Sequence, residues 1–298
     1  MSVASFNATR PKESLTGHVD VLVVGAGISG LGLAHYLTTN LPGHSYAIVD
    51  SRDAIGGTWD LFRYPGIRSD SDLHTFGYEF KPWTSDNAIA DAHEILDYLH
   101  EVIEEDRLAP RIYMQHKVIR ADFSTQTGRW TVTLERDGQQ WQTTCNWLFG
   151  ATGYYDYSAG YTPDFEGQED FEGRIVHPQS WPEDLDYSGK QIVVIGSGAT
   201  AVTLIPAMAD KAGHITMLQR SPSYVMPLPR KDPIANTLRK ALPPKAAYAA
   251  TRRFNIGKGR FIYNLCQRNP KLARTLIRKI NVAALPKNFD VEDRKSVV

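Results

Sequence analysis

Two short glycine-rich turns constrain the fold of this 298-residue chain more than any other feature. The first is Gly25-Ala-Gly-Ile-Ser-Gly30, and the second is Gly196-Ser-Gly-Ala-Thr-Ala201. Each turn follows an apolar run typical of a buried parallel strand and precedes a segment with helical spacing. A strand, a glycine turn and a helix in this order form the phosphate-binding part of a Rossmann-like unit. The sequence therefore predicts an α/β fold with two Rossmann-like dinucleotide-binding domains.

The first turn has the complete spacing of a dinucleotide-binding site. We expect Gly25 to permit the tight turn, Gly27 to let the backbone approach a pyrophosphate, and Gly30 to let helix and strand pack closely. The pyrophosphate would lie at the positively polarised N-terminus of the helix. Asp50 follows Gly30 by 20 residues, and its carboxylate would accept hydrogen bonds from the ribose hydroxyls. The alternative is a glycine turn that serves packing alone.

The second turn differs from the first in the residues that end its second strand. The predicted site contains four residues of the turn: Gly196, Gly198, Thr200 and Ala201. The following strand ends in Arg220-Ser221, with no acidic residue. A guanidinium can bind a 2′-phosphate through two hydrogen bonds, whereas a carboxylate would repel it. The pattern therefore favours NADPH over NADH, with Ser221 as a further contact, unless Arg220 is only a solvated charge.

The segment between the two turns carries a third pattern, F-x-G-x-x-x-H-x-x-x-W-P. Its fixed positions are Phe171, Gly173, His177, Trp181 and Pro182. All five match the fingerprint of the type I Baeyer–Villiger monooxygenases, which are class B flavoprotein monooxygenases. The chain resembles this family from about Val19 to Asp290, and it looks most like the actinobacterial branch that includes the ethionamide-activating monooxygenase. For His177 we favour a linker or hinge role over an acid–base role.

The resemblance implies two cofactors and a reaction. In that family one domain binds FAD and the other binds NADPH and carries a helical insertion. NADPH reduces FAD, and the reduced flavin takes up O₂ as a C4a-peroxide. This species converts a ketone to an ester or lactone, or oxidises sulfur or nitrogen in substrates such as thioethers and thioamides. By position, Asp70 matches the carboxylate that pairs with the catalytic arginine, and Gly153 matches the hinge between domains.

A loop over residues 51–85 is expected to line the FAD site, because it combines glycines, charges and aromatic residues. Gly57 would permit close approach to the flavin half of the cofactor, and we assign Thr58 to the same site. Trp59 would pack against the isoalloxazine ring, or else be an ordinary core tryptophan. Asp70 is assigned to the FAD site as well, with loop capping as the alternative.

The chain departs from the family pattern at its C-terminal end. The resemblance would place the catalytic arginine after the helical insertion, so we expect a C-terminally truncated chain in which Asp70 lacks its arginine partner. The last residues, Glu292–Val298, do not resemble the family's continuation. One alternative is a non-catalytic nucleotide-binding fragment. Another is an N- or S-oxygenating flavin monooxygenase, although such enzymes usually have Tyr or Phe and then a basic residue where this chain has Trp181-Pro182.

The predicted boundaries divide the chain into four parts. These are a flexible tail over 1–18, an incomplete FAD-binding domain over 19–153, a linker with the NADPH-binding domain over 154–229, and a truncated basic helical insertion over 230–298. Within the insertion, we expect the helical pattern to break at Pro243-Pro244, Gly257, Gly259 and Pro270. Within the first domain, we expect separate strands over 140–144 and 147–151, the second of them buried.

The net charge is zero, but it is the sum of an acidic N-terminal part and a basic C-terminal part. Residues 1–219 carry 15 Lys/Arg and 29 Asp/Glu, whereas residues 220–298 carry 18 and 4. We favour a basic part that packs on the acidic part and faces cofactor phosphates, with peripheral contact to an anionic membrane as the alternative. No motif indicates nucleic-acid binding or a metal site, and two distant cysteines, Cys145 and Cys266, form no redox pair. The expected location is the cytoplasm, with peripheral attachment at the inner face of the membrane as the alternative.

Overall fold

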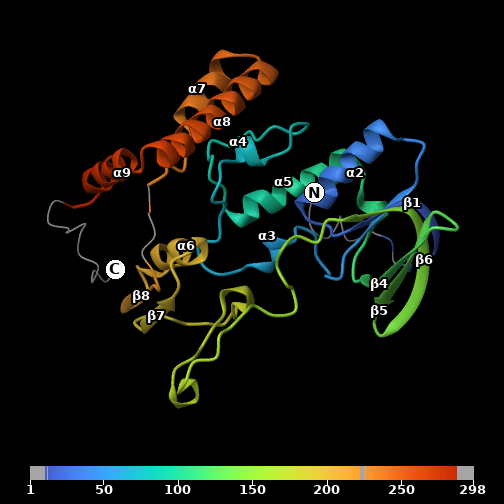
Figure 1. Ribbon diagram of the computed structural model, residues 1–298, viewed down its shortest axis with the longest axis horizontal. Helices are drawn as coiled ribbons and strands as arrows, with labels where there is room; N and C mark the ends of the chain where they lie inside the picture. The colour runs from blue at the N-terminus through green and yellow to red at the C-terminus, as the bar shows by residue number, and fades with distance from the viewer. Residues whose placement is uncertain (1–10, 12, 222–224, 226, 287–298) are drawn as a thin grey trace. The chain divides into compact units, whose positions relative to one another are not determined.

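The computed structural model describes residue 11, residues 13–221, residue 225 and residues 227–286 (Figure 1). The chain forms two compact units. The first unit comprises Met1–Arg63 and Ala92–Trp181, and the second comprises Tyr64–Asp91 and Pro182–Val298. The chain thus passes between the units three times. These units differ from the predicted domain boundaries, because residues 64–91 pack with the second unit and the linker up to Trp181 packs with the first.

The first unit is built on a six-stranded sheet with the order β3-β2-β1-β6-β5-β4. Its strands are β1 (Gly17–Val24), β2 (Tyr46–Val49), β3 (Ile112–Tyr113), β4 (Lys117–Ser124), β5 (Arg129–Arg136) and β6 (Gln139–Gly150). The strands β3, β2, β1 and β6 are parallel, and β6, β5 and β4 form an antiparallel meander. The Rossmann-like half therefore lies at the β1–β2 side, where the first glycine turn connects the two strands.

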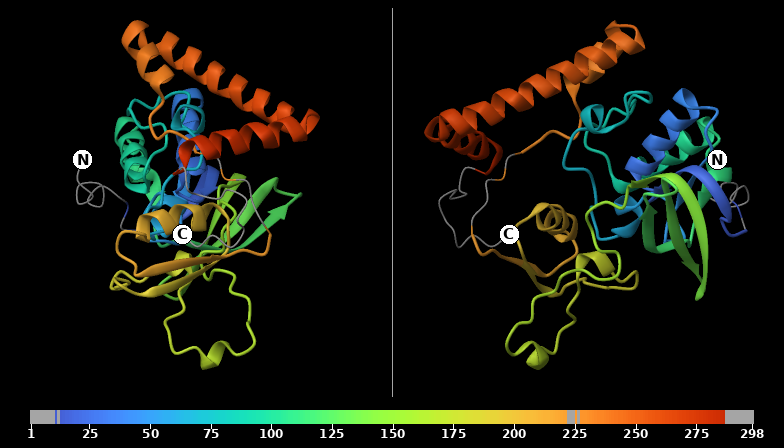
Figure 2. Two further views of the ribbon diagram at one scale, coloured as in Figure 1. Left: turned by 90° about the vertical axis from the view of Figure 1, so that its left-hand side faces the viewer. Right: turned by 45° about the vertical axis from the view of Figure 1, so that its right-hand side comes forward.

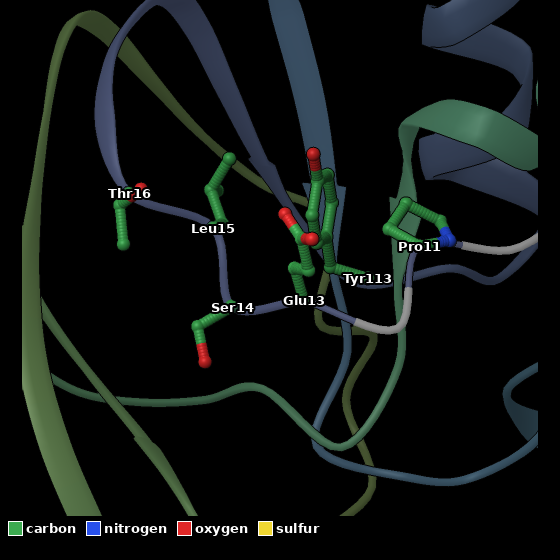
Figure 3. Close-up of a pocket in the computed structure, with 6 residues that line it drawn as sticks. All are labelled: Pro11, Glu13, Ser14, Leu15, Thr16 and Tyr113. Atoms are coloured by element: carbon green, nitrogen blue, oxygen red, sulfur yellow. The ribbon is translucent and has the colours of Figure 1, made fainter.

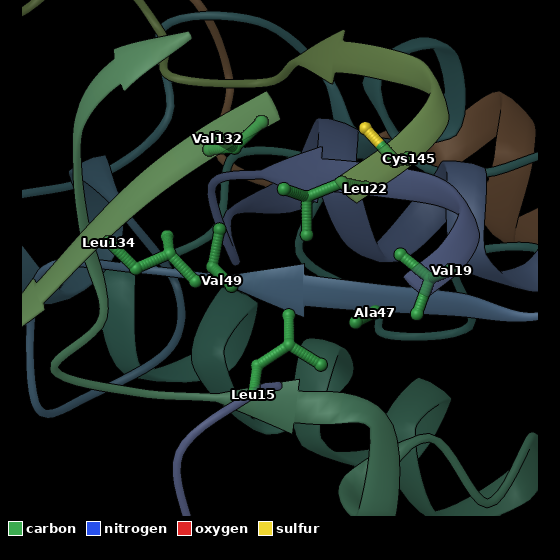
Figure 4. Close-up of a cluster of buried hydrophobic side chains, with 8 residues drawn as sticks. All are labelled: Leu15, Val19, Leu22, Ala47, Val49, Val132, Leu134 and Cys145. Carbon is green, nitrogen blue, oxygen red and sulfur yellow. The ribbon is translucent and has the colours of Figure 1, made fainter. Parts of the chain in front are cut away.

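Helices of the first unit are α2 (Ile28–Asn40), α3 (Thr58–Leu61) and α5 (Ala92–Glu105), with a short 3₁₀ turn at Ala109–Arg111. The amphipathic helix α5 buries Ile95, Leu99 and Val102, which recur at helical spacing. A second apolar cluster joins side chains from β1, β2, β5, β6 and the segment just before β1 (Figure 4). Its members are Leu15, Val19, Leu22, Ala47, Val49, Val132, Leu134 and Cys145. These contacts hold the glycine turn between a packed sheet and a packed helix.

Two predictions for the first unit need correction. Residues 13–18 are not a free tail: Leu15 is 5% exposed, and its carbonyl accepts a hydrogen bond from the Trp141 indole at 2.7 Å. Residues 1–10 and 12 lie outside the described residues. The strands expected at 140–144 and 147–151 are one continuous strand, β6, because it pairs with both β5 and β1. Trp147 on that strand is 73% exposed, so the prediction that it is buried was wrong.

The second unit contains a two-stranded parallel sheet and a group of helices (Figure 2). The strands β7 (Gln191–Ile195) and β8 (His214–Leu218) flank α6 (Ala199–Met208), which follows the second glycine turn. The other helices are α4 (Leu73–Phe76), α7 (Pro233–Ala241), α8 (Pro244–Arg268) and α9 (Pro270–Ala284). Within the described part of the chain, no helix is long and apolar enough to cross a membrane.

The helical insertion follows the predicted breaks only in part. Pro244 and Pro270 begin new helices, as expected for a residue that fits the first helical turn. The predicted breaks at Gly257 and Gly259 were wrong, because α8 runs through both. A glycine inside a helix costs about 1 kcal/mol relative to alanine, and a helix of 25 residues tolerates two such losses.

A polar cluster ties α8 to the segment around α4 within the second unit. The Asn255 amide of α8 donates hydrogen bonds to Asp72 Oδ1 at 3.2 Å and to Asp232 Oδ2 at 3.1 Å. Asp72 caps α4, and Asp232 caps α7. Arg252, one helical turn before Asn255, donates to the carbonyl of Thr75 at 2.9 Å. The helical insertion therefore holds the short segment that follows Asp70.

Replacing Asn255 is expected to destabilise the second unit. Asn255 is 6% exposed and donates to two carboxylates, so Asn255→Leu should lower the free energy of unfolding by about 2–3 kcal/mol. Urea unfolding followed by circular dichroism would measure the loss. Asn264→Leu, on an exposed position of the same helix, is the control and should change the free energy by about 0.5 kcal/mol or less. Equal stability of both variants would contradict the bridging role.

His116 makes the stability of the first unit depend on pH. It is 1% exposed, its Nδ1 lies 2.7 Å from the Met114 carbonyl oxygen, and its Nε2 accepts a hydrogen bond from the Leu15 N–H. Burial lowers the pKa of His116, and the nearby Arg136 lowers it further. The unfolded chain therefore binds more protons than the folded chain in mild acid, and the stabilisation is complete only above the ordinary histidine pKa.

We expect stability to fall as pH drops from 7 to 5, by at most about 1.4 kcal/mol per pH unit for this single group. His116→Gln should reduce that slope. It should not abolish it, because burial also lowers the pKa of His74 in the second unit. Urea unfolding at three pH values would measure the slope, and exposed His44→Gln is the control. An unchanged slope in His116→Gln would contradict this assignment.

Candidate nucleotide-binding sites

The first glycine turn has no space for a side chain at two of its glycines. Gly25 has φ +116°, and a Cβ there would lie 2.3 Å from the Ala151 carbonyl oxygen. A Cβ on Gly30 would lie 1.9 Å from the Gly25 carbonyl oxygen. Gly27 caps the N-terminus of α2, and the atom nearest to its Cβ position is the Gly57 Cα at 3.8 Å. The turn therefore leaves backbone exposed at the positive end of a helix, which fits a pyrophosphate.

Asp50 lies at the end of β2 and is bonded to the same turn. Its Oδ2 accepts a hydrogen bond from the Ala26 N–H at 2.8 Å, and its Oδ1 accepts one from the Arg52 N–H at 2.9 Å. The residue is 8% exposed, and burial raises the pKa of its carboxyl. Sequence reasoning missed this contact, which fixes the turn on the neighbouring strand. The predicted contact of Asp50 with ribose hydroxyls stays a prediction.

A second turn packs directly on the first. The Gly56 N–H donates to the Ala26 carbonyl at 3.0 Å, and a Cβ on Gly57 would lie 3.4 Å from the Gly27 Cα. Gly57 has φ +56° and caps α3, which begins at Thr58. The Arg52 guanidinium donates to the Gly57 carbonyl at 3.0 Å and pairs with Asp60. The two turns are in contact, and we call them together the glycine cradle, defined by Gly25–Gly30 and Gly56–Thr58.

Trp59 belongs to the first unit and follows the cradle residue Thr58, whereas Asp70 belongs to the second unit. Trp59 is half-buried at the start of α3, and its predicted contact with the isoalloxazine stays a prediction. Asp70 is exposed and belongs to the second unit. Burial raises the pKa of the Tyr64 hydroxyl, and the Asp70 carboxylate adds to that rise. The assignment of Asp70 to FAD therefore rests on the family resemblance.

The loop that contains Asp70 packs on α6 within the second unit. A Cβ on Gly66 would lie 2.7 Å from the Ala207 Cβ and 3.0 Å from the Thr203 carbonyl oxygen, and Gly66 has φ +80°. The Tyr64 hydroxyl bonds to Thr200 in the second glycine turn. Sequence reasoning missed these contacts, since they join segments about 140 residues apart. They connect the loop of Asp70 to the helix expected to bind NADPH.

The second glycine turn has a more open geometry than the first. Gly196 has φ +133°, and its N–H donates to the Leu218 carbonyl at 2.8 Å. Gly198 caps α6, and no atom of the described residues lies within 4 Å of the Cβ positions of these two glycines. Ala201 is buried, whereas Arg220 and Ser221 are exposed just after β8. This open helix N-terminus fits a phosphate, and the 2′-phosphate contact of Arg220 stays a prediction.

The fingerprint residues make structural contacts within the linker. A Cβ on Gly173 would lie 2.4 Å from the Phe171 ring, and a Cβ on Gly160 would lie 2.1 Å from the His177 ring. His177 Nδ1 accepts a hydrogen bond from the Gln179 N–H at 3.2 Å and so caps the short 3₁₀ turn Pro178–Ser180. Trp181 and Pro182 stand at the third passage between the units. Phe171, Gly173 and His177 therefore make local packing and capping contacts within the linker.

A hollow of about 360 Å³ lies elsewhere in the first unit, beside Tyr113 (Figure 3). Its lining comes mainly from the segment before β1: Pro11, Glu13, Ser14, Leu15 and Thr16. None of these residues belongs to the glycine cradle. This hollow is therefore separate from the candidate nucleotide-binding residues of the first unit.

Comparison with known proteins identifies the family. Residues 76–233 match the flavin-binding monooxygenase-like family, and residues 23–86 match an NAD(P)-binding Rossmann-like domain. The chain belongs to the flavin-binding monooxygenase-like family. These and the following matches confirm the predicted family and the α/β fold with Rossmann-like nucleotide binding. They also confirm a flavin and a nicotinamide nucleotide as the cofactors of this family.

The most similar curated relatives include two named monooxygenases. The FAD-containing monooxygenase EthA of Mycobacterium tuberculosis is 50% identical over 278 residues, which are 93% of this chain and 57% of the relative. The probable FAD-binding monooxygenase AlmA of Acinetobacter baylyi is 50% identical over 264 residues, which are 88% of this chain and 53% of the relative. The chain thus spans about half the length of the curated relatives that it matches.

Solved structures of Baeyer–Villiger-type enzymes have the same fold over most of this chain. Cyclohexanone monooxygenase with bound cyclohexanone is 29% identical, with a TM-score of 0.66 over 76% of this chain and 44% of that one. Steroid monooxygenase bound to NADP is 33% identical, with a TM-score of 0.66 over 79% of this chain and 44% of that one. The OTEMO complex with FAD and NADP is 30% identical, with a TM-score of 0.61 over 70% of this chain and 40% of that one.

Proposed function

We propose that this chain carries the FAD- and NADPH-binding part of a Baeyer–Villiger-type monooxygenase. The reaction would insert one oxygen atom of O₂ into a ketone to give an ester or lactone, or oxidise sulfur or nitrogen in a substrate such as a thioether or thioamide. The observation that carries the proposal is the presence of two glycine turns at helix N-termini, with the complete five-position fingerprint between them. The similar solved structures support the same assignment, since one holds cyclohexanone and another holds FAD with NADP.

The residues of the first unit would bind FAD. Gly27 and Gly57 would expose backbone to the pyrophosphate at the N-terminus of α2, and the remaining lone pairs of Asp50 would accept from the ribose hydroxyls. Thr58 would add a hydroxyl contact at the start of α3. When bound, FAD supplies the redox chemistry that accepts a hydride from NADPH and activates O₂.

The residues of the second unit would bind and select NADPH. Gly198 and the N-terminus of α6 would hold its pyrophosphate, and Arg220 and Ser221 would contact the 2′-phosphate. Asp70 would orient a cationic side chain near the reacting atoms, as the family resemblance implies. Gly153 has φ +72°, a conformation that suits glycine at the predicted hinge after β6.

The absorption spectrum of the purified chain tests this proposal directly. We expect the protein to bind added FAD, and we expect anaerobic NADPH to bleach the flavin absorbance. Bleaching requires both nucleotides in one molecule, so it tests the two sites together. A protein that binds no FAD would overturn the proposal at the glycine cradle. Bound flavin that NADPH cannot reduce, although another reductant can, would overturn the assignment of the second turn.

A further inference from the structure

One tyrosine of the linker has its hydroxyl at the glycine cradle, within the first unit. A Cβ on Gly57 would lie 3.2 Å from the Tyr157 Oη, and a Cβ on Gly153 would lie 3.9 Å from it. The same Gly57 position is 3.4 Å from the Gly27 Cα. The phenol oxygen of Tyr157 is therefore adjacent to the surface that the two turns leave open.

Three polar residues from the segment 50–58 interact with Tyr157. The guanidinium carbon of Arg52 lies 5.6 Å from the centre of the Tyr157 ring, and Thr58 bonds to its hydroxyl. Burial raises the pKa of Tyr157, and the Asp50 carboxylate adds to that rise, so the hydroxyl keeps its proton at neutral pH. It is consequently a neutral hydrogen-bond donor at a surface that suits an anion.

The chain around Tyr157 is fixed independently of the cradle. The Asp156 carboxylate accepts hydrogen bonds from the Ser158 N–H at 2.8 Å and from the Ser158 hydroxyl at 2.6 Å. The Asp156 carbonyl accepts from the Gln179 side chain at 2.6 Å, and His177 caps the turn that presents Gln179. The fingerprint segment therefore supports the position of Tyr157 through Gln179 and Asp156.

We propose that Tyr157 is a cofactor-binding residue, whose hydroxyl donates a hydrogen bond to the FAD pyrophosphate and so ties the linker to the bound cofactor. The inference rests on the proposed binding of FAD at the glycine cradle. It gives the fingerprint segment a physical role: the contacts of His177 and Gln179 place the donor, and bound FAD in turn orders the linker. A cofactor on the first unit would thereby be sensed by the segment that leads into the second.

The test compares FAD binding by wild-type protein and Tyr157→Phe. A hydrogen bond to a charged group contributes about tenfold or more to affinity, so the Kd for FAD should rise by about that factor, mainly through faster dissociation. Binding of ADP, which contains the pyrophosphate, should weaken in the same way, whereas riboflavin, which carries no phosphate, should bind both proteins equally. Tyr154→Phe is the matched control, because Tyr154 is 85% exposed in the same linker.

A second measurement separates a cofactor contact from a structural role. FAD should slow amide hydrogen exchange over residues 153–160 in the wild-type protein, and this protection should be reduced in Tyr157→Phe at saturating FAD. Wild-type protein that binds no FAD would overturn the proposed function itself. If the wild-type protein binds FAD, equal or tighter binding by Tyr157→Phe would overturn only the role of Tyr157, and so would equal weakening of riboflavin and FAD.

Discussion

Gly30→Ala is expected to abolish FAD binding by the first unit. The new Cβ would lie 1.9 Å from the Gly25 carbonyl oxygen, which is backbone and cannot move without opening the turn. Gly25→Ala should have a similar effect, because its Cβ would meet the Ala151 carbonyl oxygen at 2.3 Å. We expect each variant to lose about 4 kcal/mol or more of folding free energy, measured by urea unfolding, and to retain no FAD after gel filtration.

Substitutions at two other glycines distinguish the cost of a steric collision from the cost of backbone strain. Gly43 has no atom of the described residues within 4 Å of its Cβ position and no left-handed φ, so Gly43→Ala should change stability by about 0.5 kcal/mol or less. Gly17 has equally open space but φ +87°, so Gly17→Ala should cost about 1–2 kcal/mol. A Gly30→Ala protein as stable as Gly43→Ala would show that α2 does not pack on the turn as described.

Arg220→Ala is expected to remove the preference for NADPH. A bidentate, charge-assisted contact with the 2′-phosphate should contribute about 100-fold to affinity, so the Kd for NADPH should rise by that factor. NADH lacks this phosphate and should bind as before. Titration of nucleotide fluorescence would measure both constants. Arg274→Ala, at an exposed position of α9, should leave both unchanged. Equal weakening of NADPH and NADH would mean that Arg220 does not contact the 2′-phosphate.

The elements around the first turn could be predicted because their signals are local. Glycine spacing, the apolar run before it and the helical spacing after it all lie within residues 17–50, and the structure has β1, α2 and β2 there. Helix α5 also has a local signal, because its buried residues recur at helical spacing. Local patterns fail where a strand has two different neighbours, so the continuous strand β6 was predicted as two strands and the exposure of Trp147 was missed.

The contacts that complete the sites could not be predicted, because they join distant segments. Gly66 on Thr203, Tyr157 beside Gly57 and Asn255 on Asp72 are each separated by about 100 residues or more. No periodicity or turn signal encodes such a pairing. The sequence indicated that residues 51–85 matter, but it did not indicate that this segment divides between the two units after Arg63. The residue types in the sequence indicated which segments form the sites, whereas the partners of these residues could be identified only from the fold.

The interleaved order of segments has a consequence for synthesis on the ribosome. Asp72 bonds to Asn255 across 183 residues, and β1 pairs with the end of β6 through Val24 and Gly150. At about 5–20 residues per second, the segment around α4 waits roughly 10–40 s for its partners on α8. That segment includes Leu73, which is 1% exposed in the folded chain. Some residues that are synthesised early therefore complete their tertiary contacts late. Slow expression at low temperature, together with a chaperone that holds unfolded chains, should favour recovery of intact protein.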